Sequence, residues 1–479
     1  NILTVLRFIE LHLLDTNKQR MMFLSAPLWG KYEDADTQAG LSHILLRILK
    51  ETLPESFERL VHYGKVVSLA KNFEAELVAM GLISDTDGIK HQNLCGKVLT
   101  PYVEDIEEHI AQKQRTSLLG KSREIMMGDY LSSMVVKDET DRCSLASLDE
   151  LVSSEKKSVR KKEMDIGNDI GDFFFLRSMR VSVCAFRIME LIHETMLEAT
   201  KCTSAARATV LYHTCRDIFE LFRSIVPAIH KQNMDNSPRV AMLFHNDCLY
   251  LSHHALVLAH MYRHDMPLEI REGVVTVDQV PLLRELGDRM FEEQIRKHKE
   301  QIMEAFSNDC YYELEEVEDK GILEAFSSSI AESLKIINDV RGQWSDLLPE
   351  NIFLYSMLVL CNDLMRITLE VLSLKNEDFL SRMKSVKADL SMNEILQVKS
   401  TLEMLISRAD KLTKTAKVSV RSEMMPYAEP IKQVYDVLNH TLTYRILKDN
   451  AEDGKLSELD ESQITGLTRF LFANESTLA

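Results

Sequence analysis

Apolar residues recur at helical spacing through most of the chain, most clearly in its second half. One series is spaced 4, 3, 4, 4 and 3 positions apart and comprises Val181, Ala185, Ile188, Ile192, Met196 and Ala199. A second series alternates 4 and 3 and comprises Phe353, Met357, Leu360, Leu364, Ile367 and Val371. Such spacing places the side chains along one face of a helix. The pattern predicts amphipathic helices that pack lengthwise, and only Val274–Val280 reads as a short strand or an extended connection.

Composition points to the same fold class. The 479 residues include only 16 glycines and 10 prolines, well below the average usage of roughly 7% and 5%. Sheets joined by tight turns need both residue types, so their scarcity favours long helices with few connections. A chain of this length also exceeds what one compact core accommodates. We therefore expect an all-α fold built as an elongated series of consecutive helical bundles.

Changes in composition divide the chain into four predicted segments. Residues 137–165 contain eight acidic residues, seven basic residues and five serines with few large apolar groups, which is typical of a flexible linker. The predicted division is a helical rod segment at 1–136, the charged linker at 137–165, a central helical bundle at 166–345 and a C-terminal helical bundle at 346–479. Within the linker, the basic run Lys156–Lys162 is either a solvated stretch or a site for anionic lipid or a nuclear signal.

Charge and cysteine usage narrow the function classes. The formal net charge is −17, which repels a phosphate backbone at long range and argues against direct nucleic-acid binding. The eight cysteines include no pair closer than 13 positions, so they form neither a CxxC motif nor a dense disulfide framework.

Three short matches to catalytic or metal-binding motifs fail at a required position. Gly120-Lys121-Ser122 lacks the glycine that a phosphate-binding loop needs five positions earlier, where Arg115 stands. His193-Glu194 has Leu197 where a zinc-binding HExxH helix needs its second histidine. Asp85–Gly88 has Ile83 at the first ligand position of a calcium loop. We assign no catalytic, cofactor-binding or metal residues, and expect no enzyme activity and no cofactor.

A histidine-rich helix at 245–264 leaves one alternative open, which is a metal-dependent helical enzyme. His260 and His264 are four positions apart and can share one metal ion, whereas His253 lies a full seven positions before His260. The same helix is apolar nearly all round, which is typical of a buried helix whose polar groups must be hydrogen-bonded. We favour a buried polar network on one face of this helix, formed by Asp247, Tyr250 and His254.

The same stretch, Phe244–His254, resembles a signature of the Zeste-White Ten family. Further matching stretches occur in the family's order: Arg180-Val181-Ser182, Met189-Glu190-Leu191, Leu197–Thr200, Asp217–Phe222, Val226-Pro227, His230-Lys231, Trp344–Ile352 and Met425-Pro426-Tyr427. The resemblance is clear over 172–355, weaker over 390–479 and diffuse over 1–136.

The resemblance implies a scaffold of the helical-rod tethering type (CATCHR-like), shared with exocyst, conserved oligomeric Golgi and Dsl-type complexes. Members of the family join Rough Deal and Zwilch at kinetochores, where they help to recruit dynein and spindle-checkpoint proteins. They also join a neuroblastoma-amplified-type solenoid and a RINT-type subunit that tether Golgi-derived vesicles at the endoplasmic reticulum. The implied location is the cytoplasm, peripheral to the endoplasmic reticulum membrane through the complex, and the kinetochore and spindle in mitosis.

In the family, the C-terminal region contacts the solenoid partner, whereas an N-terminal coiled region, expected to lie outside this sequence, contacts Zwilch or the RINT-type subunit. Here a short amphipathic segment near the chain end is the candidate partner-binding surface, with Ser462 as its expected cap. Its residues are Ile464, Leu467, Arg469, Phe470 and Leu471. The alternative is that this apolar stripe packs onto its own bundle.

Overall fold

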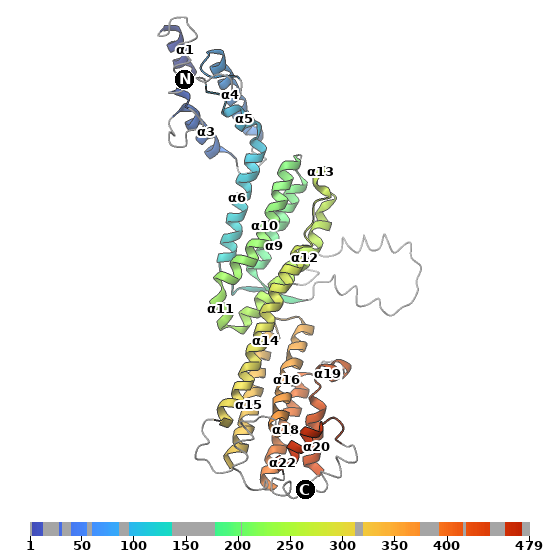
Figure 1. Cartoon of the computed structure of the whole chain (residues 1–479). Helices are drawn as coiled ribbons and strands as arrows, with labels where there is room; N and C mark the ends of the chain where they lie inside the picture. Colours follow the sequence, from blue (N-terminus) through green and yellow to red (C-terminus); the bar gives the residue numbers. More distant parts are fainter. Residues whose placement is uncertain are drawn as a thin grey trace, which may run out of the picture. The chain divides into compact units, whose positions relative to one another are not determined.

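A computed structural model describes most of the chain (Figure 1). The described residues are 2–12, 28–30, 40–54, 60–85, 95–136, 178–202, 204–311, 320–373, 392–414, 418–440 and 456–471. Over these ranges the chain is helical apart from turns, connections, an isolated bridge and one two-stranded sheet. The predicted all-α fold class is confirmed.

The chain forms two compact units that are interleaved in sequence. The first comprises residues 1–128, 187–225 and 257–276, and the second comprises 129–186, 226–256 and 277–479. The predicted division at 136, 165 and 345 stays a prediction, and the predicted linker 137–165 lies outside the described residues.

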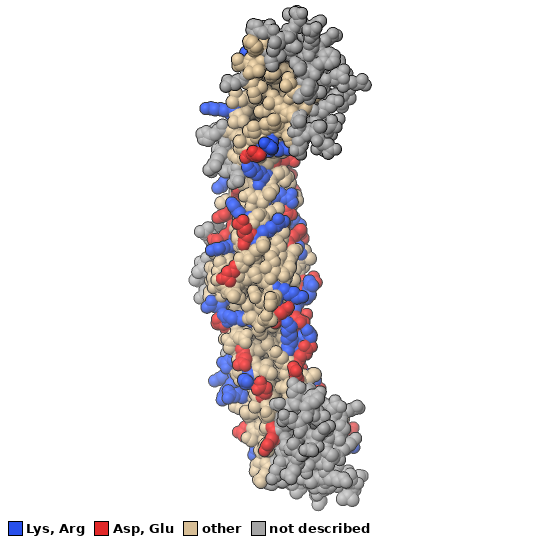
Figure 2. Space-filling model, turned by 90° about the vertical axis from the view of Figure 1, so that its left-hand side faces the viewer, with Lys and Arg blue, Asp and Glu red and all other residues tan. Residues whose placement is uncertain are grey.

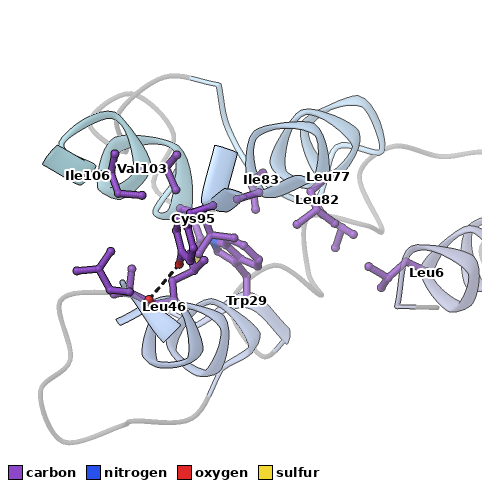
Figure 3. Close-up of a cluster of buried hydrophobic side chains, with 14 of the residues drawn as sticks. Leu6, Trp29, Leu46, Leu77, Leu82, Ile83, Cys95, Val103 and Ile106 are labelled. Atoms are coloured by element: carbon purple, nitrogen blue, oxygen red, sulfur yellow. Dashed lines mark hydrogen bonds between the residues drawn. The ribbon is translucent and has the colours of Figure 1, made fainter. Parts of the chain in front are cut away.

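The first unit contains α1 (Ile2–His12), α3 (Leu41–Thr52), α4 (Leu60–Ala79), α5 (Leu99–Glu104), α6 (Ile106–Met127) and α13 (Leu268–Arg271), with most of α9 (Val183–Thr200) and α10 (Ala205–Ile229) and the end of α12 (Pro238–Arg263). Its N-terminal part has an apolar core (Figure 3) in which Trp29 lies among side chains such as Leu46 of α3 and Leu77 of α4. The Trp29 ring nitrogen donates to the carbonyl oxygen of Gly96 at 3.1 Å, so the one polar atom of this ring is satisfied.

A buried carboxylate fixes the start of α5 against α4. Glu74 is fully buried, and its two oxygens accept the backbone N–H groups of Val98, Leu99 and Thr100 at 2.7, 2.6 and 2.6 Å. No side chain of the flanking residue caps this helix, so Glu74 satisfies donors that the helix itself leaves unpaired. The negative charge also lies at the positive end of the helix dipole.

Polar contacts join α6 and α10 to α9 within the first unit. The Gln114 side-chain nitrogen and the nearly buried Arg207 guanidinium each donate to one oxygen of Glu198 at 2.6 Å. These contacts add direction to the apolar packing between the helices.

The second unit contains β1 (Ser133–Val136) and β2 (Met179–Ser182) together with the helices α11 (Lys231–Asn236), α14 (Gln279–Tyr311), α15 (Lys320–Trp344), α16 (Glu350–Leu372), α18 (Met392–Leu412), α19 (Val418–Met424), α20 (Ala428–His440) and α22 (Glu461–Leu471). The strands pair antiparallel, with Val136 opposite Met179 and Ser133 opposite Ser182. Helices α14 and α15 run side by side, and α16, α18, α20 and α22 gather next to them (Figure 1).

Helix α16 is the central helix of this C-terminal group. It contacts α14, α15, α19, α20 and α22, and the apolar residues of its predicted stripe from Met357 to Val371 are buried. Among the described helices it alone is long and apolar enough to cross a bilayer. Its most apolar stretch of 18 residues is 61% buried within the protein. Burial among five neighbours accounts for its apolar composition.

Two local expectations need correction or completion. The sequence pattern placed Val181 in a helix, but Val181 lies in β2, and α9 begins at Val183. The reason is that the backbone at 179–182 pairs with β1, and the Arg180 N–H also donates to the carbonyl oxygen of Leu347. In Val274–Val280, residues 274–276 form a connection without regular structure, residues 277 and 278 form a turn, and α14 begins at Gln279, so the strand alternative is wrong.

Candidate functional site

Three consecutive buried polar residues of α12 each bind a different part of the second unit. His245, Asn246 and Asp247 are 3%, 0% and 0% exposed. His245 Nδ1 lies 3.0 Å from the carbonyl oxygen of Gly287 on α14, and because a carbonyl only accepts, this nitrogen carries the proton. Asn246 Nδ2 donates to the carbonyl oxygens of Arg180 and Leu347, both at 2.8 Å.

Asp247 is the most connected of the three. Its Oδ1 accepts the backbone N–H of Ser182 at 2.7 Å, and its Oδ2 accepts the Ser182 hydroxyl at 2.6 Å and the Tyr130 hydroxyl. The Ser182 oxygen in turn accepts the backbone N–H of Ala185 at 3.0 Å and thereby caps α9. We call Asp247, Tyr130 and Ser182 the Asp247 node.

Burial dominates the electrostatics of the node. It raises the pKa of Asp247 to about 7, although the hydrogen bonds from Ser182 and Tyr130 oppose the shift. Burial, with the nearby Asp247 charge, also raises the pKa of Tyr130 and of the Cys248 thiol and takes the pKa of Cys184 to about 12. Thiols with raised pKa values stay protonated and are poor nucleophiles, so the node has the chemistry of a structural element.

The predicted network residues are all buried, with Tyr250 and His254 each 1% exposed. Their rings form an edge-to-face pair with centroids 4.4 Å apart, whereas the bonds of Asp247 shown above lead to Tyr130 and Ser182. Sequence reasoning missed Tyr130, Asn246 and the role of Ser182. A signal existed for Ser182, because it ends the matching stretch Arg180-Val181-Ser182.

The histidines of the metal alternative are dispersed. His260 and His264 are exposed, with ring centroids 6.4 Å apart, whereas His245, His253 and His254 are buried. Within the described ranges no group of three or more His, Cys, Asp or Glu residues is placed to hold a metal ion. The geometry thus offers at most a pair of ligands at His260 and His264.

The terminal helix α22 divides the predicted partner-binding residues into two sets. Leu467, Phe470 and Leu471 are 2%, 3% and 3% exposed, and α22 packs on α16, so these three pack within their own unit. Ile464 is half-buried and Arg469 is exposed. The cap expected at Ser462 is instead Asp460, whose Oδ1 accepts the Gln463 backbone N–H at 2.7 Å, because Asp460 is the residue that precedes the helix.

Charges of both signs are interspersed over the described surface in the view of Figure 2. Exposed ion pairs include Arg296 with Glu293 and Glu300 on α14. A groove of one sign, as nucleic-acid binding requires, is not seen on the described part of this face.

The chain is similar to known proteins over the region that contains these elements. The family model described as "Centromere/kinetochore protein zw10, C-terminal" matches residues 174–304, a range that includes Ser182 and all of α12. The centromere/kinetochore protein zw10 homolog of Rattus norvegicus is 28% identical over 457 residues, which cover 91% of this chain and 55% of that protein.

Two further relatives carry the same name. The Mus musculus homolog is 28% identical over 458 residues, covering 91% of this chain and 55% of that protein. The Arabidopsis thaliana homolog is 24% identical over 325 residues, covering 67% of this chain and 39% of that protein. The chain spans about half the length of the first two relatives.

Proposed function

Because the chain belongs to the centromere/kinetochore zw10 family, we propose that it is a non-catalytic scaffold subunit of a kinetochore assembly. The observation that carries the proposal is the match at 174–304, which coincides with helices held together by buried hydrogen bonds. Fixed helical packing suits a protein whose task is to hold partners at defined positions. Inert, protonated thiols at Cys184 and Cys248 agree with this role.

The partners are proposed from the family resemblance. They are Rough Deal and Zwilch at the kinetochore, with dynein and checkpoint recruitment as the outcome, and a neuroblastoma-amplified-type solenoid with a RINT-type subunit in Golgi-to-endoplasmic-reticulum transport. The solenoid contact is proposed for the C-terminal bundle, where Arg469 and Ile464 remain accessible while Leu467 is committed to the core.

Affinity purification from mitotic and interphase cells, followed by mass spectrometry of the bound proteins, tests the assignment. We expect a Rough Deal-type or neuroblastoma-amplified-type solenoid among the recovered proteins. Recovery of neither solenoid from either stage would contradict the proposed function.

A pair of charge-reversal variants tests the proposed surface. Arg469→Glu should weaken solenoid binding and alter its salt dependence, whereas Arg408→Glu, at another exposed position, on α18, should bind like the wild type. Equal binding by both variants would move the interface away from α22. The metal-dependent alternative gains no support from the dispersed histidines, and elemental analysis of the purified protein checks it directly.

A further inference from the structure

A single carboxylate joins both flanks of the β1–β2 pair to α12. Tyr130 precedes β1 in the chain, and Ser182 is the last residue of β2. Both donate to Asp247, and the Val183 N–H, which follows Ser182, donates to the Ser132 carbonyl at 2.9 Å. The strand pair is therefore tied to α12 through Asp247, in addition to the bond from Asn246 to the Arg180 carbonyl of β2, and all of these residues belong to the second unit.

We propose that Asp247 is a proton-dependent clamp. When Asp247 loses its proton, the release of Tyr130 and Ser182 from α12 becomes more favourable, and α9 loses the N-terminal cap that Ser182 provides. The clamp goes beyond the proposed scaffold function and does not depend on it.

The geometry explains why the proton matters. The charged form of Asp247 accepts all three donors, but the carboxylate is fully buried and these three donors are neutral groups. The neutral form removes the buried charge at the cost of one of the three hydrogen bonds, since a protonated oxygen must itself donate. We call the state with Tyr130 and Ser182 bound to Asp247 closed, and their release opening. Opening exposes the carboxylate to water, which solvates its charged form.

The titratable groups that face Asp247 come from three elements. They are Tyr130 before β1, Cys184 on α9 and Cys248 on α12, and burial raises the pKa of each, so all are neutral near neutral pH. The His230 ring stacks on the Tyr130 ring, with the two centroids 4.7 Å apart, and Arg180 lies two positions before Ser182 in β2. Asp129, next to Tyr130, is exposed, and its hydrogen bonds with Ser132 and Leu131 lower its pKa.

The direction of the pH effect follows from linkage. The closed state holds a proton on Asp247 up to a pH of about 7, whereas the exposed carboxyl has the ordinary pKa of 3.8. The closed state therefore binds more protons between these values, so opening becomes more favourable as pH rises through this window. Above about pH 7 both states are ionised, and the effect of Asp247 levels off.

Hydrogen exchange followed by mass spectrometry tests the clamp on the intact chain. Protection factors for the peptide covering 179–186, corrected for intrinsic exchange, should fall by up to about tenfold per pH unit between about pH 5 and about pH 7 and then level off. Peptides of α16, which carries none of the three node residues, should show no such slope. A pH-independent protection of 179–186 would overturn the proposal.

Three variants separate Asp247 from other titrating groups. Asp247→Asn, which carries no charge at any pH, should abolish the slope, and a slope equal to that of the wild type would overturn the clamp. Should Asp247→Asn fail to fold, Tyr130→Phe decides, because it removes one hydrogen bond to the charged form and should move the levelling point to higher pH. An unmoved levelling point in Tyr130→Phe would contradict the proposal, and Asp129→Asn is the control expected to match the wild type.

Discussion

Gly287 on α14 lies so close to Cys248 on α12 that a Cβ atom at position 287 would lie 2.9 Å from the Cys248 Cβ. The same approach lets His245 donate to the Gly287 carbonyl at 3.0 Å. Neither contact involves the flexible end of a long side chain. The crossing of the two helices is therefore set by the absence of a side chain at Gly287.

Gly287→Ala should destabilise the protein by about 1–3 kcal/mol, because the added methyl group forces α14 away from α12. Gly342→Ala on α15 is the matched control, since a Cβ there meets nothing within 4 Å, and it should be neutral or stabilising by up to about 1 kcal/mol. Chemical denaturation of both variants measures the difference. Equal stabilities of the two variants would show that α12 and α14 do not pack this closely.

Glu74→Gln should lower stability by about 1–3 kcal/mol, since one side-chain oxygen cannot accept the three backbone N–H groups that Glu74 now satisfies. Glu76→Gln on the same helix loses only the exposed ion pair with Arg7, for which about 0–1 kcal/mol is expected. Thermal unfolding followed by circular dichroism compares them. A Glu74 variant no less stable than the Glu76 variant would exclude the capping role.

His254→Leu should destabilise the fold by about 1–3 kcal/mol, because this buried imidazole packs edge to face on the Tyr250 ring and leucine cannot keep that contact. His260→Leu, at an exposed position of the same helix, should leave the melting temperature nearly unchanged. Adding zinc during the melt extends the test to the metal alternative. A zinc-dependent rise in the wild-type melting temperature that His260→Leu removes would revive that alternative.

Cleavage within 137–177 should leave two fragments that stay associated. They stay associated because β1 before this segment pairs with β2 after it, and because Tyr130 and Ser182 share Asp247. Limited trypsin digestion at the Lys156–Lys162 run, followed by size-exclusion chromatography without denaturant, measures this. Separate elution of the fragments would contradict the interleaved arrangement.

The sequence by itself determined the helices, because the apolar period is a local property of the chain. Helix α12 runs from Pro238 to Arg263 and so contains all but the last residue of the histidine-rich helix expected at 245–264. The burial of Asp247 was also predictable, since a helix that is apolar nearly all round has no face for water.

The partners of Asp247 were decided only by the tertiary structure. Tyr130 lies 117 positions away in sequence and Ser182 lies 65 positions away, and no periodicity relates such distant residues. Val181 shows the same limit, because its apolar side chain fits a helical series while the backbone beside it pairs with β1 and Leu347. On α22 the sequence predicted the amphipathic stripe. Which side of α22 meets the core depended on its packing against α16, at whose C-terminal end Ser373 lies against Gly466 of α22. Local periodicity thus fixes which residues share a helix face, whereas the choice of what that face contacts is made by long-range packing and hydrogen bonding.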